Sequence, residues 1–245
     1  MTTGLEPNPY ERAEWRATGD GLLRPGGLAL TDRAIKYCAL PAGSRVWDIG
    51  CGLGVTVAHL VTRHGLEAVG VDRSEALLDA ARSRTPSIPL ICARGDALPC
   101  AAATLDAVLA ECSWSVMSRD RGGDATNGHG ALVEFRRVIR PGGWLIISDV
   151  YARGVASIQA APLGDGLCRN LLTEAEIRTA LASQGFAIEL WEDHSAALNE
   201  FVGRMIFEFG SLSPLWGDDG DGPEGCTALK AARPGYFLLA ARRNG

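Results

Sequence analysis

An acidic residue followed by closely spaced glycines is the part of this sequence best suited to hold a ligand. The segment 45–54 reads RVWDIGCGLG, so Asp48 stands near the end of a short apolar stretch, and Gly50, Gly52 and Gly54 follow it at intervals of two. Glycine has no Cβ, so the backbone turns sharply here and a ligand can approach the main chain closely. The pattern predicts a strand, a tight ligand-binding turn and then a helix.

The charge of Asp48 narrows the class of ligand. A carboxylate two residues before the first glycine would repel a pyrophosphate, whereas it would attract the cationic amino end of an amino acid. The dinucleotide fingerprint also requires two residues before its third glycine, and here Leu53 stands alone between Gly52 and Gly54. These features favour S-adenosylmethionine over a nicotinamide dinucleotide. We expect Asp48 to hold the α-ammonium group of that ligand; the alternative is a helix-capping or fold-stabilising acid.

A second acid follows the next predicted strand, 68–71. Asp72 comes about 20 residues after the glycine turn, where a carboxylate accepts both ribose hydroxyls in dinucleotide-binding folds. The alternative is that Asp72 caps the following helix, although Ser74 already offers a cap. Arg73 either packs on the adenine or lies in solvent.

Five motifs occur along residues 45–150 in one order, and together they resemble those of class I S-adenosylmethionine-dependent methyltransferases. The style is closest to the small-molecule branch, which includes quinone-biosynthesis C-methyltransferases and arsenite methyltransferases. The motifs are VWDIGCGLG at 46–54, VGVDRS at 69–74, GDALP at 95–99, LDAVLA at 105–110 and VIRPGGWL at 138–145.

The resemblance implies a cofactor, S-adenosylmethionine, with S-adenosylhomocysteine as its product. It places Cys51 in the glycine loop, beside the methionine and ribose portions. It also implies that Asp96 accepts the exocyclic amine of adenine, that the Ala97 N–H serves a ring nitrogen, and that Leu98 helps to form an apolar adenine wall. Capping of its own loop is the alternative for Asp96.

Residues after the strand 106–110 should face the methionine end and the acceptor, because ligand sites lie at the carboxyl ends of such strands. Glu111 is a candidate general base or ammonium contact, with a structural acid as the alternative. Trp114 either meets a cation through its ring face or simply packs. Methyl transfer is an in-line displacement on an activated methyl group, so alignment matters most, and we assign no catalytic residue.

Alternating strand and helix patterns after residue 45 predict an α/β fold. The resemblance implies a Rossmann-like, doubly wound sheet of seven mostly parallel strands in the order 3-2-1-4-5-7-6, with the last strand antiparallel and helices on both faces. We expect one domain over 1–245. Its parts are an N-terminal helical cap (1–40), a cofactor-binding core (45–150) and a C-terminal part (150–245), which includes an acceptor-side insertion (195–234).

Local signals predict several helix ends. Thr31 is expected to N-cap a helix that runs to Leu40, and Gly65 and Gly185 are expected helix stops. The segment 173–176, TEAE, is a capping box.

Composition excludes several partners. The net charge of −5 provides no basic footprint for nucleic acid, and no apolar run approaches the ~18 residues of a membrane helix. Without a secretory leader pattern, we expect a cytoplasmic protein whose partner is a small-molecule acceptor. The seven cysteines form no Cys-x-x-Cys pair, so a zinc ribbon or a thioredoxin-like motif is absent. We name no metal-binding residues. The oligomeric state stays open.

Other functions remain as alternatives. The chain would be a cofactor-binding scaffold or regulatory subunit if it lacked catalysis, or a nicotinamide-dependent oxidoreductase if the dinucleotide interpretation held. Three cysteines over the cleft would suit a soft metalloid acceptor, and two histidines are candidate bases. These residues are Cys112, Cys168, Cys226, His129 and His194.

Overall fold

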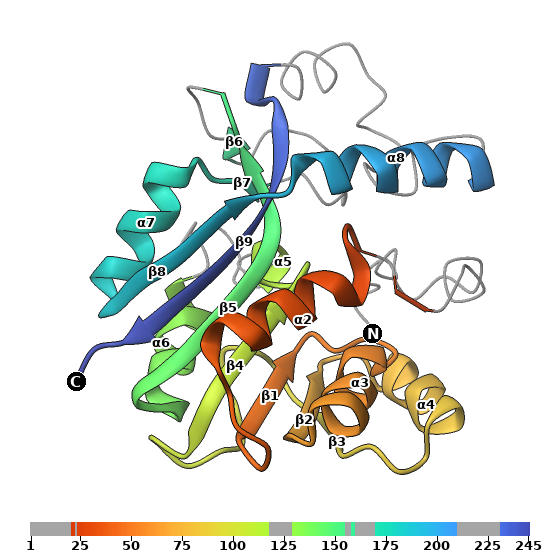
Figure 1. The fold of residues 1–245 in the computed structure, drawn as a ribbon, viewed down its shortest axis with the longest axis vertical. Helices are drawn as coiled ribbons and strands as arrows, with labels where there is room; N and C mark the ends of the chain where they lie inside the picture. Colours follow the sequence, from red (N-terminus) through yellow and green to blue (C-terminus); the bar gives the residue numbers. More distant parts are fainter. Residues whose placement is uncertain (1–20, 23, 118–128, 155–157, 160–169, 210–230) are drawn as a thin grey trace, which may run out of the picture.

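A seven-stranded sheet organises the computed structural model, which describes residues 21–22, 24–117, 129–154, 158–159, 170–209 and 231–245 (Figure 1). Its strands are β1 (Arg45–Ile49), β2 (Glu67–Asp72), β3 (Leu90–Cys92), β4 (Leu105–Glu111), β5 (Ile139–Ala152), β8 (Phe186–Asp193) and β9 (Pro234–Arg243). Their spatial order is β3-β2-β1-β4-β5-β9-β8. Numbered within this sheet alone, the order is 3-2-1-4-5-7-6. Only β9 runs antiparallel to its neighbours, so the predicted topology is confirmed.

Helices cover both faces of the sheet. They are α2 (Gly27–Cys38), α3 (Val55–His64), α4 (Glu75–Arg84), α5 (Trp114–Met117), α6 (His129–Val138), α7 (Glu174–Ser183) and α8 (Ser195–Phe209). Alternate strand residues point to opposite faces. Val46 and Leu109 pack with α2 and α3, whereas Trp47 and Val108 pack with α6 and α7. A separate two-stranded sheet pairs β6 (Ile158–Gln159) with β7 (Asn170–Leu171).

Most of the helix-end signals act as expected. Gly65 ends α3 in the left-handed conformation, and the Ser74 side chain accepts a hydrogen bond from the Leu77 N–H at the start of α4. At α7 both bonds of the capping box are present, between Thr173 and Glu176. These contacts satisfy backbone groups that each helix terminus leaves without an intrahelical partner.

The predicted role of Thr31 is wrong. The helix α2 begins four residues earlier, at Gly27, after Gly26 in the left-handed conformation, and it ends at Cys38. Thr31 lies within the helix and is fully buried, and its hydroxyl donates to the Glu111 carboxylate at 3.0 Å. The Thr31 hydroxyl, which the local pattern assigned to a helix cap, is therefore bonded to Glu111, 80 residues away in the sequence.

The strand β5 begins at Ile139, which pairs with Leu105 of β4, and β9 pairs with it in antiparallel register from Trp144 to Ala152. Among the helices of the described ranges, none has the length and apolar character to cross a membrane.

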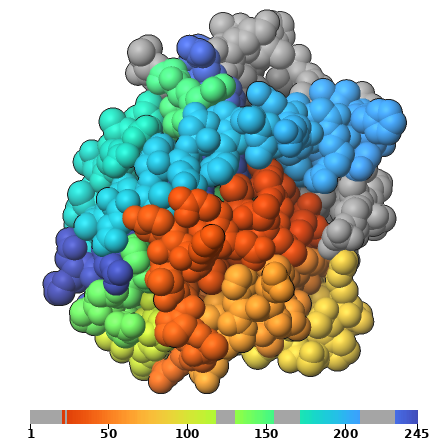
Figure 2. All heavy atoms as spheres, in the orientation of Figure 1, coloured from red at the N-terminus to blue at the C-terminus, as the bar shows by residue number. Residues whose placement is uncertain are grey.

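The sheet places one edge of β1 next to β2 and the other next to β4. The chain order reverses at this point, and ligands bind outside the carboxyl ends of strands at such a switch. Figure 2 shows α2, in red-orange, in surface contact with α3 in orange and with α8 in blue. The helix α2 thus covers the front of the sheet beside the carboxyl end of β1.

Candidate functional site

A cavity of roughly 1230 Å³, open to solvent, lies at the carboxyl ends of β1, β2, β3 and β4. The loops after these strands line it, together with residues from the segment before α2. Eight of the eleven predicted cofactor-binding residues are among its lining residues: Asp48, Gly50, Cys51, Gly52, Asp72, Arg73, Asp96 and Glu111. The remaining three, Gly54, Ala97 and Leu98, do not line it.

The glycines of the loop after β1 have different roles. Gly50, with a φ of 82°, donates its N–H to the Val71 carbonyl at 2.7 Å, and a Cβ there would collide with the Ser113 side chain. Gly52, with a φ of 51°, has no atom within 4 Å of the position that a Cβ would take. Gly54 instead begins α3 and packs toward Ile88. Gly50 thus serves the fold, whereas Gly52 leaves room beside the cavity.

Asp72 holds the glycine loop as well as facing the cavity. Its two carboxylate oxygens accept the Gly52 N–H and the Ser74 N–H, each at 2.9 Å. Burial raises the pKa of the Asp72 carboxyl, and these backbone hydrogen bonds counteract that rise. A carboxylate has about four acceptor positions, so both oxygens retain capacity for a ligand hydroxyl. The helix-start role and the ligand role are therefore compatible.

Asp48 is buried, with 3% of its surface exposed, at the inner part of the cavity. Burial raises the pKa of its carboxyl to about 8; the nearby Glu111 adds to this rise, and Arg24 opposes it. A group in this position gains its charge readily when a cation arrives, because an opposite charge within a few ångströms favours the ionised form.

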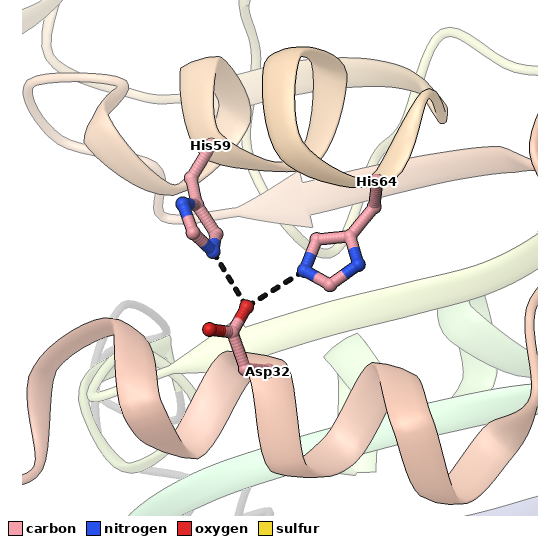
Figure 3. A group of neighbouring side chains, drawn as sticks. All are labelled: Asp32, His59 and His64. Carbon is pink, nitrogen blue, oxygen red and sulfur yellow. Dashed lines mark hydrogen bonds and ion pairs between the residues drawn. The ribbon is translucent and has the colours of Figure 1, made fainter.

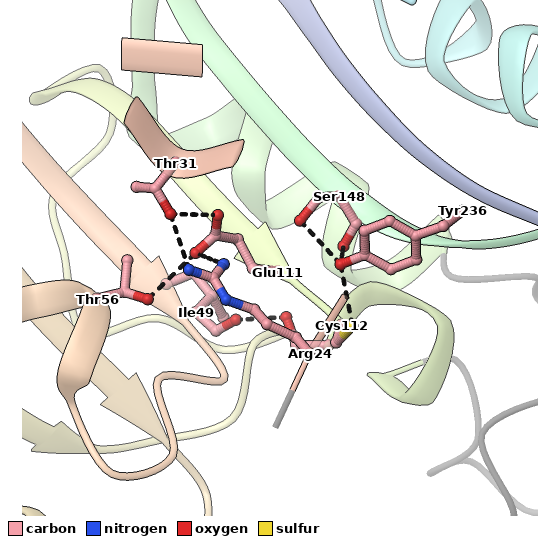
Figure 4. Close-up of polar contacts among 9 residues, drawn as sticks. Arg24, Thr31, Ile49, Thr56, Glu111, Cys112, Ser148 and Tyr236 are labelled. Atoms are coloured by element: carbon pink, nitrogen blue, oxygen red, sulfur yellow. Dashed lines mark hydrogen bonds and ion pairs between the residues drawn. The ribbon is translucent and has the colours of Figure 1, made fainter. Parts of the chain in front are cut away.

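A buried ion pair closes the same end of the cavity (Figure 4). The Arg24 guanidinium pairs with the Glu111 carboxylate and donates to the Thr31 hydroxyl at 2.8 Å. The hydroxyls of Thr31, on α2, and Thr56, on α3, donate to the two oxygens of Glu111 at 3.0 and 3.2 Å. Glu111 is therefore engaged as a structural acid at the cavity wall, in line with the alternative interpretation of this residue.

Arg24 is a site residue that sequence reasoning missed. It precedes Pro25 in a Pro-Gly-Gly segment that predicts only a chain break. Its side chain is 6% exposed and lines the cavity, and its Nε has no hydrogen-bond partner among the described residues. Buried donors are normally satisfied, so this unpaired Nε is an unusual feature next to the cavity. No local sequence signal distinguishes this arginine from the many others.

The predicted adenine end is only partly in place. Asp96 lines the cavity and accepts both donors of the Arg94 fork, at 2.9 and 3.1 Å. The Ala97 N–H donates to the Arg94 carbonyl at 3.1 Å, so it is not available to a ring nitrogen in this conformation. Leu98 is buried in the core cluster of β4 and α6 rather than in the cavity, where Leu77 and Ala93 supply apolar surface instead.

Cys112 also faces the cavity, and its Sγ lies 3.1 Å from the Tyr236 hydroxyl, which in turn contacts Ser148 (Figure 4). Burial raises the pKa of the Cys112 thiol, which disfavours the thiolate that a soft acceptor would need. The other two cysteines of the metalloid hypothesis, Cys168 and Cys226, lie outside the described residues.

Two of the remaining candidates, Trp114 and His194, are not among the residues that line the cavity. Trp114 is 4% exposed within the core cluster, which agrees with a packing role. His194 lies 3.1 Å from the Glu192 carboxylate, away from the residues that line the cavity. His129 begins α6, and its side chain lies outside the described part of the structure.

Comparisons with known proteins agree with this geometry. A family profile described as "Methyltransferase domain" matches residues 47–147. The methyltransferase GfsG of Streptomyces halstedii is 29% identical over 152 residues, which are 60% of this chain and 52% of that protein. The uncharacterised methyltransferase YodH of Bacillus subtilis is 34% identical over half of each chain. The chain spans about half the length of the curated relatives that it matches.

Solved structures show the same fold. The [4+2]-cyclase SpnF is 25% identical, with a TM-score of 0.69 over 88% of this chain and 80% of that one. A geranyl diphosphate methyltransferase in complex with S-adenosylmethionine is 17% identical, with a TM-score of 0.68 over 89% of this chain and 85% of that one. Both likenesses extend well beyond residues 47–147.

Proposed function

We propose that this chain, which belongs to the class I S-adenosylmethionine-dependent methyltransferases, transfers a methyl group from that cofactor to a small-molecule acceptor. One observation carries the proposal. Asp48, Asp72 and Asp96 all line one cavity: Asp48 is the fourth residue of β1, Asp72 ends β2, and Asp96 lies in the loop after β3. These three strands are neighbours in the sheet, so the three acids lie side by side along its carboxyl edge, as an extended nucleoside with an amino acid tail would require.

The residues present fit this cofactor by charge and by donor type. Asp72 would accept the ribose hydroxyls, since its oxygens have spare acceptor positions. Asp48 would hold the α-ammonium group, and Asp96 the adenine amine. Arg24 lines the same cavity as Asp48, and its guanidinium would supply the positive charge that attracts the α-carboxylate.

The protein contributes alignment rather than a reactive side chain. Bound S-adenosylmethionine supplies a methyl group that its sulfonium has already activated. The glycine loop and the acids would orient the cofactor, and the hydrogen bond from Thr31 to Glu111 ties α2 to the wall of the cavity. Holding two reactants in line removes much of the entropic barrier to transfer. Because Glu111 is paired with Arg24, we do not assign it the role of general base.

A direct experiment tests this function. The protein is titrated with S-adenosylhomocysteine and, separately, with NADH in a calorimeter, and is then incubated with methyl-labelled S-adenosylmethionine and a panel of small hydroxylated, amino and prenylated metabolites. We expect micromolar binding of S-adenosylhomocysteine, no binding of NADH, and label in at least one metabolite. Preferential binding of NADH would refute the proposal.

A second candidate function is catalysis that uses the bound cofactor without transferring its methyl group. Two similar proteins have names of this kind: the [4+2]-cyclase SpnF, and an S-adenosyl-L-methionine-dependent Diels-Alderase of Talaromyces variabilis that is 28% identical over 129 residues. This function predicts tight cofactor binding and cyclised product with no label transferred, so the same labelling experiment separates the two candidates.

A further inference from the structure

Two histidines and one aspartate converge on the outer side of α2 and α3, away from the cofactor cavity (Figure 3). Asp32, on α2, points toward α3, and the Nε2 atoms of His59 and His64 lie 2.6 and 2.7 Å from the same carboxylate oxygen, Oδ1. The two imidazole rings meet edge to face, with 5.3 Å between their centroids. All three candidate ligand atoms lie within 4.8 Å of one another.

We propose that Asp32, His59 and His64 form a binding site for a divalent transition metal of the zinc class. Two imidazole nitrogens and one carboxylate oxygen are a donor set that zinc and its first-row neighbours accept, whereas calcium and magnesium prefer oxygen ligands alone. Three protein ligands leave the fourth tetrahedral position to water.

The geometry needs only a small adjustment to take an ion. Ligand atoms about 2.0–2.1 Å from a tetrahedral zinc stand about 3.3 Å apart, so each N–O distance would widen by about 0.6 Å. At present hydrogen-bonding protons lie between these atoms, and a metal would replace them. The side chains are reachable, because 46% of Asp32, 18% of His59 and 21% of His64 is exposed to solvent.

The position of the site would let a bound metal connect two helices that contact Glu111. Asp32 follows Thr31, and His59 lies one helical turn after Thr56. These two threonines hold the opposite oxygens of Glu111 inside the cavity. An ion bound outside would therefore connect the same two helices whose threonines hold Glu111 at the wall of the cavity. The metal site itself does not depend on the proposed function, since it uses none of the cofactor residues.

Cobalt and zinc binding to the untagged full-length chain tests the proposal. We expect one equivalent of Co²⁺ to bind with visible d–d absorption of nitrogen and oxygen ligation and without a strong thiolate band in the near ultraviolet. Zn²⁺ should displace the Co²⁺ and raise the midpoint temperature of thermal unfolding. An ion that binds only the folded state, at a hundredfold excess over its Kd, lowers the equilibrium constant of unfolding about a hundredfold.

Variants identify the ligands. His59→Gln and His64→Gln should each reduce Co²⁺ affinity at least tenfold, whereas His194→Gln, which removes a histidine of another hydrogen-bonded pair, should not change it. Asp32→Asn provides a third variant that keeps the side-chain shape if a histidine change impairs folding. Absence of the visible band, a thiolate band, or a band that survives when His59→Gln and His64→Gln are combined would overturn the assignment and leave a hydrogen-bonded contact between two helices.

Discussion

Arg24 and Glu111 form an ion pair in which only 6% and 3% of the two side chains is exposed, at the wall of a cavity that the sequence predicts from other residues. The pair joins the segment before α2 to the end of β4. Two threonines on separate helices complete it. Three parts of the chain that are distant in the sequence thus meet at one carboxylate: residues 24–31, Thr56 and Glu111 itself.

Replacing Arg24 by methionine should destabilise the protein by about 3 kcal/mol, because it leaves the buried Glu111 charge without its counter-ion. The matched control is Arg33→Met, which breaks the more exposed pair with Glu192 and should cost at most ~1 kcal/mol. Urea unfolding measures both. Adding Glu111→Gln to Arg24→Met should restore part of the loss. Equal losses for the two single variants would contradict the role of the buried pair.

Replacing Asp72 by asparagine should weaken binding of S-adenosylhomocysteine by ~10- to 100-fold, since hydrogen bonds to a charged group contribute about 1.5–3 kcal/mol. Asparagine keeps the shape of the side chain but loses one acceptor oxygen. The Gly52 N–H, the Ser74 N–H and the ribose hydroxyls would then compete for the one oxygen that is left. Calorimetry gives the affinity. Asp79→Asn, on the exposed side of α4, serves as the control. Unchanged affinity in Asp72→Asn would disprove the ribose assignment.

Cofactor affinity should depend on pH through Asp48. Burial raises the pKa of its carboxyl to about 8 in the free protein, so the group is mostly neutral at pH 6 and must lose its proton to hold an ammonium group. Affinity for S-adenosylhomocysteine should therefore rise from pH 6 to 8, by at most about tenfold per pH unit for one proton. Above this range the amino group of the ligand itself loses charge.

The Asp48→Asn variant is the control for this pH dependence. An amide does not titrate, so the variant should bind more weakly at pH 8 and show a flatter profile between pH 6 and 8. Calorimetry in buffers of different ionisation enthalpy should also detect proton release on binding to the natural protein. The same slope in the variant would assign the effect to another group.

Alanine at the first two glycines of the loop should separate folding from binding. Gly50→Ala puts a Cβ against the Ser113 side chain at a φ of 82°, so it should destabilise the protein by about 3 kcal/mol or more. Gly52→Ala meets open space, and its φ of 51° should cost only ~1 kcal/mol. Its methyl group points where a ligand would lie close to the backbone, so cofactor affinity should fall more than stability. Thermal unfolding and calorimetry test the pair, and a reversed order of stability would contradict this interpretation.

Several parts of the fold follow from short-range patterns. Ser74 and the Thr173–Glu176 box cap their helices as predicted, because a cap involves groups only two or three residues apart. The prediction fails at Thr31, where the nearest unsatisfied acceptor belongs to Glu111, on a distant strand. A prediction from local spacing does not include a partner that is distant in the sequence.

The order of the strands could be predicted from the sequence because its motifs resemble those of a known family. The positions of Asp48, Asp72 and Asp96 at or near the ends of successive strands could also be predicted, and parallel strands bring these ends to one edge. The packed fold alone shows that Arg24 pairs with Glu111, that Ala97 and Leu98 do not line the cavity, and that Asp32 contacts two histidines of another helix. The physical reason is that hydrogen bonds and ion pairs act over a few ångströms, and such distances between remote residues exist only after helices pack on the sheet.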